Sequence, residues 1–224
     1  MNILENGLSC LGFDEKKQKA VLPQLEAYVS ELLLFNKVYD LVGTNSRDEV
    51  YTRHILDSLA PFTIIQTLVE ERGFSEKIKP CFVDIGSGAG LPGIPLAICF
   101  PEFSFSLLER MSRRCAFLEN VLSILQLENA QVLNTEAEKY TGEGFDFAVF
   151  RAFRPLDIKM TETILSLLKP EGLALAYKGK KDKIEIEMRE IHALVGEDWN
   201  LRELALPFLD SLERHLVIFK AVSN

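Results

Sequence analysis

One stretch near the middle of the chain limits the possible folds more than any other. The apolar run from Cys81 to Ile85 leads directly into Gly86, Gly88 and Gly90, and an apolar segment with two prolines follows. Alternating glycines after an apolar run are typical of a strand, a tight turn and a helix start, because glycine has no Cβ and accepts positive φ. N–H groups at the start of that helix would face a ligand. The stretch therefore predicts a ligand site at the carboxyl end of a strand in an α/β sheet.

Two acids near the glycines indicate what kind of ligand this is. Asp84 precedes the first glycine by two residues, and Glu109 ends the next apolar run. An acid about 20 residues beyond the glycines is placed to accept hydrogen bonds from ribose hydroxyls. Leu91 stands where the dinucleotide motif G-x-G-x-x-G has a glycine. The pattern favours a ribose ligand without a pyrophosphate, such as S-adenosylmethionine, whose sulfonium cation would gain from Asp84; the alternative is a glycine loop that only makes a tight turn.

Length, charge and cysteine content restrict the class of protein. With 224 residues and a net charge of −8, the chain suits one α/β domain plus an extension, and the charge disfavours indiscriminate nucleic-acid binding while allowing a local basic patch. The four cysteines have no metal-ligand spacing. The sequence shows neither a signal peptide nor an apolar run of about 20 residues. We therefore expect a cytoplasmic protein with reduced thiols, no metal ion and no membrane segment.

The first third of the chain has helical periodicity. Apolar residues recur at helical spacing over residues 14–40, where Asp14 is the expected N-cap. A second helix is expected from residue 46 or 47 to about residue 70, kinked or divided at Pro61. We expect residues 1–75 to form a helical extension packed on a catalytic domain of residues 76–224.

The rest of the chain alternates strand and helix. This order is typical of a parallel sheet with right-handed crossovers. The last two strands are joined too closely for a helical crossover, so they must be antiparallel. The expected strands are residues 81–85, 103–108, 130–134, 145–150, 172–178, 201–206 and 215–220. A seven-stranded, mostly parallel sheet that ends in an antiparallel hairpin is the fold of a class I, Rossmann-like methyltransferase.

Several of these segments together resemble one family. The chain has Arg-His-Ile-Leu-Asp-Ser at 53–58, Asp-Ile-Gly-Ser-Gly-Ala-Gly-Leu-Pro-Gly-Ile-Pro-Leu at 84–96, Arg-Ala at 151–152 and Arg-His-Leu-Val-Ile at 214–218. These motifs resemble the RsmG family, also called GidB, over nearly the whole chain. The resemblance implies transfer of a methyl group from S-adenosylmethionine to N7 of one guanine in bacterial small-subunit (16S) ribosomal RNA.

The resemblance also implies roles for individual residues. Gly86 and Leu91 would line the methionine and ribose part of the cofactor, Ala137 and Glu138 would meet the adenine, and Arg151 would lie beside the cofactor near the target base. Together with the residues of the glycine stretch, the expected cofactor-binding residues are Asp84, Gly86, Gly88, Gly90, Leu91, Glu109, Ala137, Glu138 and Arg151.

The chemistry expected from the residues agrees with that activity. Guanine N7 has an available lone pair and no proton, so the enzyme mainly has to position it and needs no general base. The sequence offers no evident base or nucleophile. Arg151 is the expected catalytic residue, since a guanidinium can donate to guanine O6 or to a phosphate and can stack on a base. The alternative is an arginine at a strand end that pairs with a surface acid.

Basic residues are the candidates for RNA contact. The candidates are Arg53, His54, Arg154, Lys178, Lys180 and Lys181, and a second basic cluster consists of Arg110, Arg113 and Arg114. Such clusters are often only solvated helix faces. His54 and Asp57 are three residues apart, which predicts a hydrogen bond between them on one helix face.

Other functions stay open at this point. An NAD-dependent oxidoreductase would need a glycine at position 91. A methyltransferase for another RNA or a small molecule, or a non-catalytic protein that binds S-adenosylmethionine or RNA, would share the fold. The favoured hypothesis is a monomer that methylates small-subunit ribosomal RNA presented in a ribosomal particle.

Overall fold

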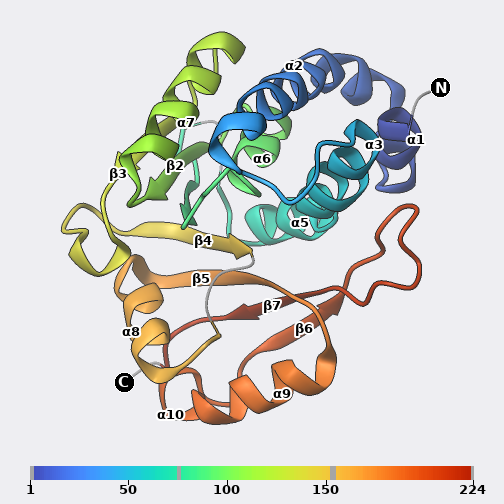
Figure 1. The fold of residues 1–224 in the computed structure, drawn as a ribbon. Coiled ribbons are helices and arrows are strands. Elements are labelled where there is room, and N and C mark those ends of the chain that lie inside the picture. Colours follow the sequence, from blue (N-terminus) through green and yellow to red (C-terminus); the bar gives the residue numbers. More distant parts are fainter. Residues whose placement is uncertain (1–2, 75–76, 152–154, 223–224) are drawn as a thin grey trace.

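The computed structural model describes residues 3–74, 77–151 and 155–222 and contains a seven-stranded sheet in the order β3-β2-β1-β4-β5-β7-β6 (Figure 1). The strands are β1 (Cys81–Ile85), β2 (Ser104–Glu109), β3 (Ala130–Asn134), β4 (Phe145–Arg151), β5 (Leu168–Lys178), β6 (Asn200–Glu203) and β7 (His215–Phe219). The first five strands pair in parallel, and β7 is antiparallel to both β5 and β6. The expected methyltransferase topology is confirmed, with β5 starting earlier than expected.

Strand register decides which residues meet at the functional edge. Asp84 of β1 lies opposite Leu107 of β2 and Val149 of β4, so the carboxyl ends of these three strands lie side by side. Because β7 is antiparallel to β5, its beginning lies at the same edge. Lys178 at the end of β5 is therefore opposite His215 at the start of β7.

Helices cover both faces of the sheet (Figure 1). Those preceding β3 lie on one face and share one apolar core, whereas those following β3 lie on the other face and share a second core. The helices of the first face are α1 (Ile3–Cys10), α2 (Glu15–Tyr39), α3 (Arg47–Val50), η1 (Tyr51–Leu56), α4 (Asp57–Leu59), α5 (Phe62–Glu71), α6 (Gly93–Cys99) and α7 (Ser112–Leu125). The others are η2 (Ala137–Lys139), α8 (Ile158–Ser166), α9 (Lys181–Glu190) and α10 (His192–Val195).

The helical extension is part of the sheet's own core. Side chains of α2, such as Leu25 and Tyr28, are fully buried in the same apolar cluster as Phe82 of β1. Asp14 caps α2 as expected, because its carboxylate accepts from the Lys17 N–H at 2.7 Å. The boundary expected near residue 75 falls outside the described residues, and the division into two domains stays a prediction.

The second expected helix is more irregular than its periodicity suggests. Pro61 separates α5 from the preceding turns, as expected, and Ser46 caps α3. Between them, residues 51–56 form a π-helix, η1, whose hydrogen bonds run from i to i+5. π-Helical turns occur frequently at functional sites, and this one contains two candidate residues, Arg53 and His54.

The cysteines and the apolar helices were the subject of two further expectations. Cys99 and Cys115 are buried, Cys81 is half-buried and Cys10 is exposed, and all four are free thiols. Among the described residues, no helix is both long and apolar enough to cross a bilayer.

Candidate functional site: two cavities at the carboxyl edge of the sheet

The glycine turn follows β1 immediately and explains why glycines are required there. Gly86, Gly88 and Gly90 have φ values of 69°, 58° and 90°, a region that residues with a Cβ rarely adopt. A Cβ on Gly90 would also collide with the side chain of Ile94. The Gly86 N–H donates to the Leu108 carbonyl at 2.8 Å, so the turn is fastened to β2. The backbone of the turn therefore requires glycine at these three positions.

Two buried polar side chains, Asp84 and Tyr28, hold the glycine turn in position. Asp84 is 1% exposed, and its Oδ2 accepts from the Gly93 N–H at the start of α6, at 2.9 Å. Burial raises the pKa of Asp84 to about 7. Tyr28 of α2 donates from its hydroxyl to the Ala89 carbonyl at 2.7 Å. These contacts show that both the start of α6 and the N-terminal helices position the turn, and no local sequence pattern predicted this role of Tyr28.

Glu109 has the position expected of a ribose-binding acid, and it also stabilises the loops. Its Oε2 accepts from the Gly88 N–H at 3.0 Å, and its Oε1 accepts from the Met111 N–H at 2.9 Å. Arg114 lies 3.9 Å from Oε2. A carboxylate has about four lone-pair sites, so two remain for ribose hydroxyls.

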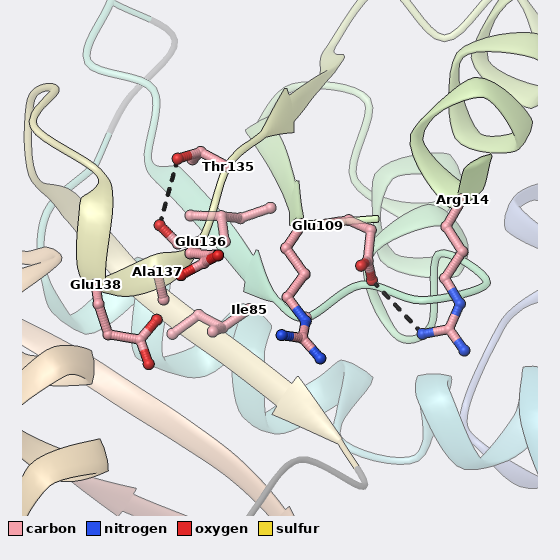
Figure 2. A pocket seen from close by; sticks show the side chains of 10 residues that line it. Ile85, Glu109, Arg114, Thr135, Glu136, Ala137 and Glu138 are labelled. Atoms are coloured by element: carbon pink, nitrogen blue, oxygen red, sulfur yellow. Dashed lines mark hydrogen bonds and ion pairs between the residues drawn. The ribbon is translucent and has the colours of Figure 1, made fainter. Parts of the chain in front are cut away.

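The first cavity opens beside Glu109 and has a volume of about 270 Å³ (Figure 2). Figure 2 shows Ile85 between the loop that carries Glu136 and Glu138 and the side chain of Glu109 on β2. Apolar and charged side chains therefore both border the first cavity. The residues that line this cavity are Ile85, Gly86, Leu108, Glu109, Arg110, Arg114, Thr135, Glu136, Ala137 and Glu138. This combination fits an adenosine, with flat apolar contact for the base and an acid for the ribose.

The expected cofactor residues divide into two groups. Those that line the first cavity are Gly86, Glu109, Ala137 and Glu138. Those that form its support are Asp84, Gly88, Gly90 and Leu91, which do not line the cavity. Contact of either group with the cofactor stays a prediction. Arg151 lies in a different cavity.

A second cavity, of about 370 Å³, lies at the ends of β4 and β5. It brings together four residues that were expected to act in catalysis or RNA contact, namely Arg53, His54, Arg151 and Lys178. The remaining lining residues are Asp57, Phe150, Tyr177, Gly179 and Arg214. Because β1 and β4 are neighbours, the two cavities lie at the same edge of the sheet.

Asp57 organises the second cavity by holding two arginines. Its Oδ2 accepts from Arg151 Nη1 at 2.8 Å, while Arg214 donates to Oδ1 from Nε at 2.8 Å and to Oδ2 from Nη2 at 3.0 Å. The Asp57 side chain is only 2% exposed and that of Arg151 10%. One carboxylate against two guanidiniums leaves one positive charge beside the cavity. Arg151 thus pairs with a buried acid rather than a surface acid.

The hydrogen bond expected between His54 and Asp57 is wrong. Both Asp57 oxygens accept from arginines, and His54 Nδ1 instead lies 3.3 Å from Arg151 Nη2. His54 lies in η1 and Asp57 begins α4, and both side chains contact Arg151 of β4. Burial, together with the charge of Arg151, lowers the pKa of His54 to about 4.

The lysine segment after β5 is only partly free. Lys178 Nζ donates to Glu187 of α9 at 2.6 Å, and the Lys181 N–H donates to Glu213 at 2.6 Å. Lys180 and Lys181 are exposed at the start of α9, next to the second cavity. Arg154 falls outside the described residues, so its RNA contact stays a prediction.

Sequence reasoning did not assign Arg214 to the site, although a signal was present. The expected antiparallel pairing of the last strand places its first residues beside the end of β5, which is the predicted substrate edge. The position of Arg214 directly before that strand could therefore have identified it as a candidate for substrate contact. The partnership of Asp57 with Arg151 and Arg214 spans 94 and 157 residues along the chain and had no local signal.

The fold and the first cavity define the class of protein. The sheet resembles that of the tRNA (m1A58) methyltransferase TrmI from Aquifex aeolicus, with a TM-score of 0.58, 13% identity and coverage of 88% of this chain and 76% of that chain. It also resembles the N-terminal domain of human METTL16 in complex with SAH, with a TM-score of 0.55, 12% identity and coverage of 87% and 82%. The protein is a class I methyltransferase that uses S-adenosylmethionine.

Sequence comparison identifies the family within this class. The family model described as "GidB: rRNA small subunit methyltransferase G" matches residues 21–217. The chain is 36% identical to the "Ribosomal RNA small subunit methyltransferase G" of Treponema denticola, over 97% of this chain and 93% of the relative. The chain belongs to the GidB family. The expected family is confirmed, and the oxidoreductase alternative is excluded.

Proposed function

We propose that the protein transfers the methyl group of S-adenosylmethionine to N7 of a guanine in small-subunit ribosomal RNA. The observation that carries this proposal is the pair of cavities at one edge of the sheet, one suited to adenosine and the other lined by cationic donors. The relatives' printed name supports small-subunit ribosomal RNA as the substrate.

The second cavity suits a reaction that needs no proton removal. S-Adenosylmethionine supplies an already activated methyl group, so the protein has to orient the acceptor nitrogen in line with it. N7 of guanine is unprotonated and can attack directly. The one carboxylate in the second cavity, Asp57, is bound by two guanidiniums and has neither the freedom nor the exposure expected of a general base. Arg151 holds the base or its phosphate in place.

The net charge of the chain bears on how the RNA substrate reaches the second cavity. The chain has a net charge of −8, so RNA would be repelled from most of its surface and attracted at the second cavity. We infer that a ribosomal particle presents the base to a monomeric enzyme in the cytoplasm.

The test is base-level mapping of N7-methylguanine in 16S ribosomal RNA from cells with and without the gene. We expect one guanine to lose its methyl group when the gene is deleted, and small subunits from the deletion strain to regain it on incubation with the protein and labelled S-adenosylmethionine. Failure to transfer label would favour a non-catalytic binding protein. Equal labelling of naked RNA fragments would contradict presentation by a particle.

A further inference from the structure

Among the described residues that line the second cavity, most polar side chains donate hydrogen bonds, and Asp57 is the one carboxylate. Its cations are Arg53, Arg151, Lys178 and Arg214, none of which can accept. The Asp57 carboxylate accepts three bonds from arginines, which leaves one of its about four lone-pair sites, and its side chain is only 2% exposed. The Tyr177 hydroxyl is bound to the Ser58 carbonyl at 2.8 Å. A ligand group that enters this cavity therefore meets donors.

His54 belongs to this donor set because of its contact with Arg151. A guanidinium has only N–H groups, so the 3.3 Å approach of Arg151 Nη2 requires a lone pair on His54 Nδ1. The imidazole is then neutral, with its proton on Nε2. The lowered pKa of His54 agrees with that state. No described residue accepts a hydrogen bond from Nε2, which leaves this N–H available to a ligand.

Donor-only surroundings distinguish the two purines. At the edge that carries N7, guanine presents two acceptors, N7 and O6, whereas adenine presents N7 and the N6 amino donor. Among the described side chains of the second cavity, an amino group would meet mainly cationic donors, and an unpaired buried polar group is costly. Because N7 must keep its lone pair free to attack the methyl group, O6 is the atom that can receive a donor.

We propose that the Nε2–H of His54 donates to O6 of the target base and makes the second cavity select 6-oxopurines over 6-aminopurines. This inference rests on the proposed function and names a specificity residue for it. A neutral imidazole with a single N–H suits a carbonyl better than a phosphate, which would favour a charged donor.

The test pairs an enzyme variant with a substrate variant. Small subunits are reconstituted with 16S ribosomal RNA that keeps the target guanine or replaces it by 2,6-diaminopurine, which keeps N7 and the 2-amino group but has an amino group in place of O6. We expect the wild-type protein to methylate 2,6-diaminopurine at least about tenfold more slowly than guanine, and the H54A variant to reduce that ratio about tenfold. Changes in N7 reactivity and base pairing cancel, because both enzymes meet the same substrates.

Controls separate contact with O6 from a structural role. R53A changes a cation of the same cavity and should leave the ratio between the two substrates unchanged. If H54A unfolds, which thermal melting will show, H54L fills the same volume without a donor and undergoes the same comparison. A ratio equal to that of the wild type in the folded variant would overturn the role of His54. Absence of N7 methylation of the natural guanine by the wild type would instead overturn the proposed function.

Discussion

The two cavities lie at one edge of the sheet and are built in different ways. The first is made largely of backbone and of side chains next to the strands β1, β2 and β3, so each part of it follows a strand directly in the sequence. The second is made of charged side chains from η1, α4, β4, β5 and the residue before β7. A site formed by turns can be recognised in contiguous sequence, whereas a site formed by ion pairs depends on how distant segments meet.

The two cavities also differ in the charged side chains that line them. Three acids, Glu109, Glu136 and Glu138, line the first together with two arginines, Arg110 and Arg114, so acids outnumber cations there. The second has one buried acid that serves as a fixed counter-ion for two arginines. The two sites are thus suited to opposite partners, a cationic cofactor and an anionic RNA.

The largest expected effect tests whether Asp57 is the structural centre of the second cavity. In D57A, two guanidiniums lose their buried partner, and we expect the free energy of unfolding to fall by about 3–5 kcal/mol. Urea unfolding followed by circular dichroism measures this change. D48A, an exposed acid of α3, should change stability by at most about 0.5 kcal/mol.

R151A provides the contrast within the same cluster. Asp57 keeps both bonds from Arg214, so we expect a stability loss of only about 1–2 kcal/mol, with a larger loss in turnover. A loss of stability as large as that of D57A would show that Arg151 is mainly structural.

G86V should disable the first cavity without affecting the second. A valine side chain would enter the space that Gly86 lines, and a φ of 69° is strained for a β-branched residue. We expect the dissociation constant for S-adenosylmethionine, measured by calorimetry, to rise roughly 100-fold or more. G43V is the matched control, since no atom lies within 4 Å of a Cβ built there. Unchanged affinity in G86V would place the cofactor elsewhere.

E109Q should have an intermediate effect. The amide keeps the shape of the carboxylate, but its NH2 group must face either the Gly88 N–H or the Met111 N–H. We expect about tenfold weaker binding of S-adenosylmethionine. E128Q changes an exposed acid outside the first cavity and should bind normally. Normal binding by E109Q would mean that Glu109 only supports the glycine turn.

The two regions also differ in the sign of their pH dependence. The raised pKa of Asp84 means that the folded state binds the extra proton between about pH 4 and 7, so this residue's contribution to stability falls as pH rises. The lowered pKa of His54 means that the unfolded state binds the extra proton between about pH 4 and 6.5, so stability falls as pH drops.

The two contributions oppose each other in the wild type and can be separated. Between pH 4 and 6.5, we expect D84N to become more stable with rising pH and H54L to become less stable, each by at most about 1.4 kcal/mol per pH unit. Urea midpoints across this range measure both slopes. Parallel curves for the two variants would show that neither residue titrates as inferred.

Much of the fold could be predicted because its determinants are local. Asp14 caps α2, the run at residues 130–134 forms β3 with the expected bounds, and the short final connection forces an antiparallel β7. The first cavity followed from the glycines and Glu109 for the same reason. The sequence predicted a helix at residues 47–59 but did not predict its π-helical turn. Such a turn has no separate signature in side-chain periodicity.

The sequence by itself determined the class of fold, the cofactor and the edge of the sheet where chemistry occurs, because apolar periodicity and glycine turns act between neighbours in the chain. Only the tertiary structure decided that Asp57 holds Arg151 and Arg214, that His54 faces Arg151 and that Tyr28 supports the glycine turn. Such contacts depend on the direction and distance of side chains brought together across 61 to 157 residues, and no local pattern encodes that meeting.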